Sequence, residues 1–221
     1  MKKKSIEKVI MKNLAFKFTF TGLFLLLIAA CSTVPTAQSP ANNLAQMEKD
    51  TAYITSITKA PETEHLVTAK RFLHGFNAGE IALNALRKEQ DRQAVAQPGM
   101  TELGRRAFAE IDAEKLENLA ARVYARHLTQ KQLLDLANFI ESDAGGRFFN
   151  QSVKMGLEGK STNAADMMKQ FKADELIQIM KFAQSETFVS LAQKLPTINA
   201  ELKVEAGLLG QAIMRKYLQS L

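Results

Sequence analysis

One stretch of this sequence, LTQKQLLDLANFIES at residues 128–142, decides the fold class. Thr129, followed three residues later by Gln132, has the pattern of a capping box, in which each side chain accepts a backbone amide at the start of a helix. Behind that start the apolar residues recur at spacings of three and four: Leu133, Leu136, Ala137 and Ile140. This is the stripe of an amphipathic helix. Ser142 and Asp143 then offer the start of another helix.

The same apolar stripe appears on both sides of this stretch. Its members are Leu66, Ala69, Leu73 and Phe76; Ile81, Ala82, Ala85 and Leu86; Leu116, Leu119, Ala120 and Val123; and Leu202, Ala206, Leu209, Ile213 and Tyr217. Gly and Pro are sparse, with 11 and 5 residues, and Trp is absent. The sequence therefore predicts an all-α fold, a single domain of antiparallel helices over residues 61–221.

Proline, glycine and candidate N-cap residues indicate where these helices begin and end. Pro61 suits a first helical position, and Asp112 is a candidate N-cap. We expect a helix over residues 80–94, a loop at residues 97–99 and a short helix from residue 101 through residue 111. Gly145 and Gly146 would let a neighbouring segment approach closely. Pro196 should bend or restart the last helix, and Gly207 and Gly210 either pack closely or are merely tolerated.

Residues 128–142 align with residues 171–185 without a gap. The matched pairs are Leu133 with Leu176, Leu136 with Ile179, Phe139 with Phe182 and Ser142 with Ser185. An internal helix-hairpin repeat is one interpretation. The other is that two unrelated amphipathic helices share a pattern.

These motifs resemble the bacterial family called domain of unknown function 2059, over roughly residues 62–221. The first copy supplies His127-Leu128-Thr129, Leu133, Phe139, Ser142 and Gly145; the second supplies Phe171, Glu175-Leu176, Phe182, Ser185 and Lys194-Leu195-Pro196. Neither copy is complete, since Asp143 and Glu186 replace a proline of the family pattern. The resemblance implies an exported helical protein and no particular chemistry.

The N-terminal 31 residues predict where the protein resides. Six Lys and one Glu precede an uncharged run of 13 residues, Phe18 to Ala30, which is too short to span a bilayer comfortably. Ala29-Ala30 then comes directly before Cys31, the only cysteine. The segment resembles a bacterial lipoprotein signal, with either Met1 or Met11 as the start. The alternatives are an uncleaved signal anchor, or an ordinary cleavage site beside a chance cysteine.

We therefore expect three regions. Residues 1–30 form the signal peptide, residues 31–60 carry the lipidated Cys31 and a flexible tether or arm, and residues 61–221 form the helical domain. Residues 32–43 are polar with Pro35 and Pro40, whereas residues 44–60 favour a short helix or a partly ordered arm. Ser32 leans toward the outer membrane if the cell is Gram-negative, so we expect a periplasm-facing anchor in the inner or outer membrane.

The net charge of +6 at first suggests a nucleic-acid partner. Six of the 29 basic residues and one of the 23 acidic residues lie in residues 1–30, so the rest of the chain carries only +1. Without a clustered positive surface, nucleic-acid binding is not expected. With Cys31 acylated, no disulfide can form.

Several polar residues are candidates for chemistry. His65 and His74 would lie on opposite faces of one helix, and His127 extends an apolar stripe. Asp174 and Glu175 fit the first turn of a helix, where acids complement the dipole. The serines at 142, 152, 161, 185 and 190 lack a nucleophile elbow. Four methionines, Met155, Met167, Met168 and Met180, either fill the core or line an adaptable groove.

No catalytic residue, cofactor site or metal site is predicted, and Cys31 is the one site residue. The expected function is a membrane-tethered lipoprotein with a binding or structural role in the cell envelope, with an unknown envelope protein or lipid as partner. The alternative is a periplasmic enzyme, such as a hydrolase, with a dispersed active site.

Overall fold

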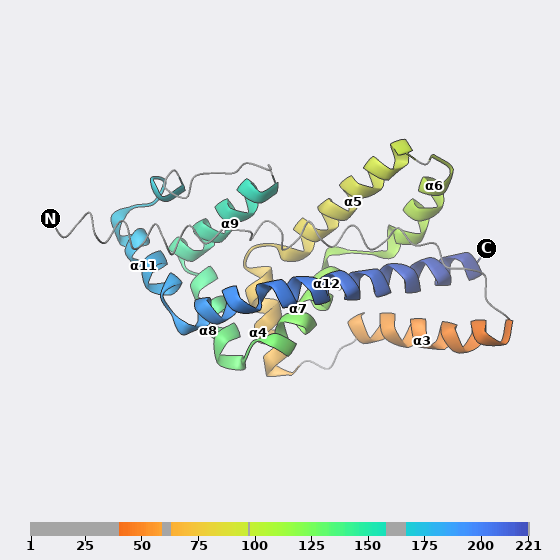
Figure 1. Cartoon of the computed structure of the whole chain (residues 1–221), viewed down its shortest axis with the longest axis horizontal. Helices are drawn as coiled ribbons and strands as arrows, with labels where there is room; N and C mark the ends of the chain where they lie inside the picture. Colours follow the sequence, from red (N-terminus) through yellow and green to blue (C-terminus); the bar gives the residue numbers. More distant parts are fainter. Residues whose placement is uncertain (1–39, 59–62, 97, 158–166, 221) are drawn as a thin grey trace.

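The computed structural model describes residues 40–58, 63–96, 98–157 and 167–220. Within these ranges every regular element is a helix, so the predicted all-α class is confirmed. In chain order they are α3 (Pro40–Thr58), α4 (Glu64–His74), α5 (Ala78–Ala96), α6 (Pro98–Ala107), the 3-10 helix η3 (Phe108–Glu110), α7 (Ala113–His127), α8 (Gln130–Ile140), α9 (Asp143–Leu157), α11 (Ala173–Ala183) and α12 (Glu186–Gln219). Figure 1 shows α12 running along the molecule with α3 beside it.

The predicted helix starts at Asp112, Thr129, Ser142 and Ser185 are confirmed. Asp112 Oδ1 accepts the amide of Lys115 at 2.8 Å. Thr129 and Gln132 form both halves of the capping box before α8. The cap of α4 is Thr63, which accepts the amide of Leu66 at 3.2 Å. Pro61 lies outside the described residues.

One predicted loop is wrong, and one of the two alternatives predicted at Pro196 is excluded. Pro98 and Gly99, expected in a loop, form the first turn of α6, because a proline at the first helical position lacks only an amide that would be unpaired there anyway. The last helix does not restart at Pro196 but continues as one helix of 34 residues. Ile198 and Leu202, just beyond the proline, are fully buried, and this packing offsets the hydrogen bond that Pro196 cannot make.

Helix α3 is the element that was predicted least well from the sequence. It begins at Pro40, inside the stretch expected to be a tether, and extends to Thr58. Asp50 pairs with Arg215 and Tyr53 with Glu205, so α3 and α12 run antiparallel. Helices α4 and α8 instead run parallel, because His65 contacts Leu128 and, further along both helices, Arg71 contacts Asn138. The helices are thus not all antiparallel to their neighbours.

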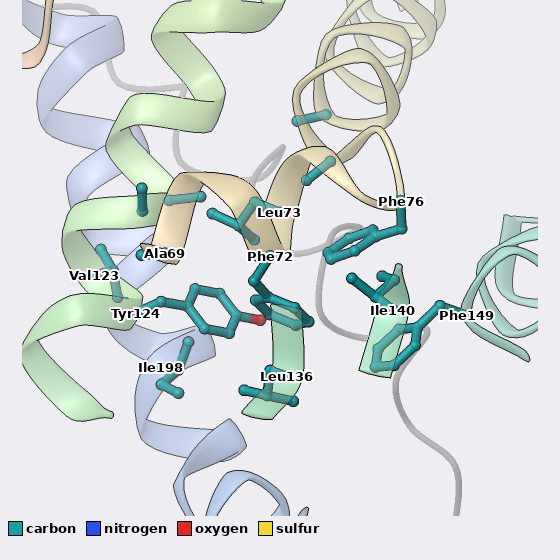
Figure 2. Packing of buried hydrophobic residues seen from close by; sticks show 14 of the residues in the cluster. Ala69, Phe72, Leu73, Phe76, Val123, Tyr124, Leu136, Ile140, Phe149 and Ile198 are labelled. Atoms are coloured by element: carbon teal, nitrogen blue, oxygen red, sulfur yellow. The ribbon is translucent and has the colours of Figure 1, made fainter. Parts of the chain in front are cut away.

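The core lies where α4, α7, α8, α9 and α12 meet. Phe72 is fully buried and contacts the rings of Phe76, Tyr124 and Phe149 at centroid distances of 5.4–5.9 Å. In Figure 2 the Tyr124 side chain reaches toward Phe72 from α7, while Ile198 enters from α12. Burying a large apolar side chain contributes roughly 1.5–3 kcal/mol, so this cluster is the main source of stability.

The turns after α8 and α11 have the same hydrogen bonds. Ser142 Oγ donates to the carbonyl of Phe139 at 2.6 Å, and Ser185 Oγ donates to that of Phe182 at 2.7 Å. Each serine also caps the following helix. The Phe139 and Phe182 rings stack at a centroid distance of 3.8 Å. Whether a duplication produced this likeness stays a prediction.

Candidate functional site

Several titratable side chains come together where α3, α7 and α12 meet. We call this group the polar cluster: Tyr53, Arg126, His127, Glu201 and Glu205. Arg126 joins the two carboxylates, with Nε 2.6 Å from Glu201 Oε1 and Nη2 2.7 Å from Glu205 Oε1. His127 Nε2 donates to Glu201 Oε2, and the Tyr53 hydroxyl donates to Glu205 Oε2. The cluster thus links three helices that are distant in sequence.

Arg126 and His127 are consecutive residues in the last turn of α7, and the side chains of both contact Glu201 of α12. Glu201 and Glu205 are four residues apart and therefore lie on one face of α12. Lys194, about two turns before Glu201, donates its Nζ to the carbonyl of His127 at 2.7 Å. That bond satisfies an acceptor at the C-terminus of α7, where a positive charge is favourable.

Charge and burial shift the acid–base equilibria of the cluster. Burial by itself would raise the pKa of Glu201, but the hydrogen bond from His127 and the charge of Arg126 lower that pKa below its ordinary value. Burial and the neighbouring Glu205 carboxylate raise the pKa of the Tyr53 hydroxyl. Both groups therefore keep a fixed protonation state at neutral pH, Glu201 charged and Tyr53 neutral.

Both carboxylates of the cluster are held in ion pairs and hydrogen bonds. A general base needs an acceptor atom that is open to the substrate proton. Here Glu201 has one carboxylate oxygen on Arg126 and the other on His127, and Glu205 has one on Arg126 and the other on Tyr53. These contacts hold helices together, which is what the cluster can do as it stands.

The three histidines, taken one by one, have different partners. His65 Nε2 donates to the carbonyl of Leu128 at 2.8 Å, and exposed His74 lies 3.6 Å from Glu117. His127 belongs to the polar cluster. Among the described residues no three His, Cys, Asp or Glu side chains converge as a metal site would require.

The paired acids Asp174 and Glu175 diverge as expected for the first turn of α11. Glu175 Oε2 accepts the amide of Lys172 at 2.7 Å, and its other oxygen pairs with Arg147 of α9. The backbone bond and Arg147 lower the pKa of Glu175 despite its burial. Asp174 is exposed. Glu175 thus fixes the start of α11 and ties it to α9.

The other candidates also have structural positions. Ser142 and Ser185 are caps, and Ser152 Oγ donates to the carbonyl of Phe148 at 2.7 Å. Met167 is buried in the core, and Met168 and Met180 are half-buried. Ser161, the side chain of Met155 and the lipid-attachment candidate Cys31 lie outside the described residues.

Two interactions between α3 and α12 were among those not predicted from the sequence. Arg215 donates through two nitrogens to the buried Asp50 carboxylate at 2.6 and 2.8 Å, and Tyr53 reaches Glu205. These pairs lie 165 and 152 residues apart. Because no local pattern relates such distant positions, only the packing of α3 on α12 shows them.

Comparison with known proteins gives one family match. Residues 114–159, from α7 through α9, match the family described as "Uncharacterized protein conserved in bacteria (DUF2059)". The resemblance based on Thr129, Phe139, Ser142 and Gly145 is therefore confirmed for this part of the chain. No curated protein and no solved structure matches the sequence. None of the helices in the described ranges is both long enough and apolar enough to cross a membrane.

Proposed function

We propose that this protein is a lipoprotein of the bacterial cell envelope, anchored by acyl chains on Cys31, and that its helical domain binds a partner protein or lipid. The observation that carries the proposal is the uncharged run from Phe18 to Ala30, which follows a lysine-rich head and ends directly before the only cysteine. Each buried CH₂ contributes about 0.8 kcal/mol, so two or three acyl chains would anchor the domain stably.

The state of the polar cluster supports binding over catalysis. All four carboxylate oxygens of Glu201 and Glu205 accept hydrogen bonds from Arg126, His127 or Tyr53. A hydrolase would need a nucleophile, a base and an orienting group arranged around an open site. A tethered binding module needs only an accessible surface and a fixed location.

The anchor is tested by the Cys31→Ser variant, expressed in cells fed with labelled palmitate. We expect the wild type in the membrane fraction with label, and the variant without label, as a soluble protein or an unprocessed precursor. Ser32→Ala is the matched control, because it changes the neighbouring hydroxyl and leaves the thiol. Label that persists on Cys31→Ser protein would refute lipidation of Cys31.

Binding and catalysis are separated by complementing a deletion strain at matched protein levels. If location and surface carry the function, alanine at His65, His74, His127, Asp174 or Glu175 should leave the phenotype largely intact, whereas Cys31→Ser should weaken or abolish it. A stable alanine variant that is fully inactive, together with a released domain that still works, would favour the hydrolase instead.

A further inference from the structure

The start of α3 and the end of α12 lie at the same end of the domain. Asp50 pairs with Arg215 in an antiparallel arrangement. Met47, about one turn before Asp50, therefore lies toward Leu218, about one turn after Arg215. Figure 1 shows the first turns of α3 next to the C-terminus. We call the surface around Met47, Arg215 and Leu218 the anchor end.

The length of chain before α3 limits where this end can be. Nine residue steps separate Cys31 from Pro40, the first residue of α3. A fully extended chain spans at most about 3.6 Å per residue, so the start of α3 stays within about 30 Å of the lipidated cysteine. Helix α12, with 34 residues, is about 50 Å long. With Cys31 acylated, the anchor end would stay within about 30 Å of the membrane surface, whereas the opposite end of α12 could lie much farther away.

The anchor end carries exposed apolar side chains. Met47 is 37% exposed and Leu218 is 40% exposed. Leu208 and Val204 of α12 are 45% and 61% exposed. Spacings of four and ten residues keep Val204, Leu208 and Leu218 within about 80° of one helix face. Gln211 and Arg215 lie on the same face between Leu208 and Leu218, so Val204 and Leu208 form a separate apolar pair, and the exposed apolar side chains of the anchor end itself are Met47 and Leu218.

Several charged groups near the anchor end are paired. Arg215 is bound to Asp50, and Lys216 lies 3.3 Å from Glu110 of η3. Arg106 pairs with Glu102 at 2.8 Å. Glu48 and Lys49, beside Met47, are exposed and opposite in sign. The nearby charges are thus mixed in sign, and contact would depend on burial of the apolar side chains at the interface.

We infer that the anchor end contacts the surface of the bilayer that holds the acyl chains of Cys31. The inference deepens the proposed function and rests on acylation of that cysteine. A short linker gives the anchor end a millimolar effective concentration at the membrane. Even a weak apolar contact through Leu218 and Met47 would then be occupied much of the time.

The test uses the full-length acylated protein in phosphatidylcholine vesicles that contain lipids with a quencher near the headgroup. Acylation blocks the thiol of Cys31, so one new cysteine can carry an environment-sensitive fluorophore. Leu218→Cys places it at the anchor end. Val189→Cys is the matched control, since Val189 is on the same helix, near its other end, and is 46% exposed.

We expect at least twofold stronger quenching at position 218 than at position 189, unchanged by salt or by added phosphatidylglycerol. Equal quenching, or stronger quenching at position 189, would overturn the inference while leaving the anchor intact. Intact mass of the same sample reports acylation of Cys31 separately. A sample without acyl chains would overturn the proposed function, and the inference with it.

Discussion

Gly145 occupies a position where a single methyl group has no room. A Cβ added there would lie 1.8 Å from the carbonyl oxygen of Phe139, because the chain turns back sharply between α8 and α9. The same addition at Gly104, in α6, meets nothing within 4 Å. The close approach expected from Gly145-Gly146 is therefore real, and the neighbour is the end of the preceding helix.

These two glycines give opposite predictions. Gly145→Ala should lower the free energy of unfolding by about 1–3 kcal/mol, since the backbone must shift to admit the methyl group. Gly104→Ala should raise it by about 0.5–1 kcal/mol, because alanine favours a helix interior. Urea unfolding followed by circular dichroism measures both. Equal effects of the same sign would show that the turn after α8 is looser than described.

Tyr124 is fully buried, and in the part of the chain that the structure describes its hydroxyl has no hydrogen-bond partner. Burial raises the pKa of this hydroxyl. An unsatisfied buried polar group costs about 1–3 kcal/mol. Tyr124→Phe should therefore keep the stability unchanged or raise it by about 1 kcal/mol.

The matched change is Phe72→Ala, which removes a ring from the same cluster and should cost about 3–5 kcal/mol. Thermal unfolding of both variants distinguishes the hydroxyl from the ring. A clear loss of stability in Tyr124→Phe would reveal a partner for the hydroxyl, such as a buried water.

At the scale of elements, α3 differs from the core helices in how it is held. Ile57 joins the hydrophobic core, while Tyr53 and Ile54 pack against it only partly buried. Its other contacts are polar, chiefly Asp50 with Arg215, Tyr53 with Glu205 and Ser56 with Arg122. We expect α3 to open locally before the core does.

Removing the Asp50 charge tests whether α3 opens before the core helices do. Asp50→Asn leaves Arg215 without its buried carboxylate and should cost about 3 kcal/mol, concentrated in α3. Amide exchange should accelerate in α3 and remain slow in α8. The control is Glu89→Gln, which breaks the ion pair with Arg92 on α5 and should leave α3 unchanged. Uniform acceleration in both helices would mean that α3 is not a separate unit.

Acid should loosen the same helix. Burial alone raises the pKa of Asp50, but hydrogen bonds from Arg215 and Gln46 lower it below its ordinary value, so the folded state binds its proton less readily than the unfolded state. Its stabilisation is full above an ordinary carboxyl pKa of about 4 and is lost as the pH falls further. Glu201 behaves in the same way.

Exchange of α3 amides should therefore accelerate, relative to α8, as the pH is lowered from about 5 to 3. In Asp50→Asn protein this acid dependence should be smaller. Loss of α3 protection on raising the pH toward 7, rather than on lowering it, would contradict the assignment.

At the scale of the whole molecule, we predict that the domain begins with α3. The sequence suggested residue 61, but Ile57 is buried in the core and Asp50 neutralises Arg215. Fragment 40–221 should unfold at a higher temperature than fragment 61–221, because the shorter fragment exposes the apolar surface under Ile57 and leaves Arg215 unpaired. Circular dichroism with and without EDTA gives the melting temperatures, and we expect chelator to change neither. Identical melting of the two fragments would restore the boundary at residue 61.

The sequence alone determined those features of the fold that depend on residues close together in the chain. A cap needs a side chain and an amide three residues apart, so Asp112, Thr129, Ser142 and Ser185 could be recognised as helix starts. An amphipathic stripe repeats within two turns, so the all-α class followed from its spacing. The prediction of lipidation at Cys31 also comes from a contiguous motif.

The tertiary structure alone decided which helices meet and which polar groups pair. Amphipathic stripes are interchangeable, so the pattern could not tell that α3 packs on α12 or that α4 runs parallel to α8. The polar cluster joins residues up to 152 positions apart. Helix α12 continues through Pro196 because the packing of Ile198 and Leu202 outweighs one missing hydrogen bond. The free energy gained by burial depends on contacts throughout the molecule, so a local sequence pattern cannot predict it.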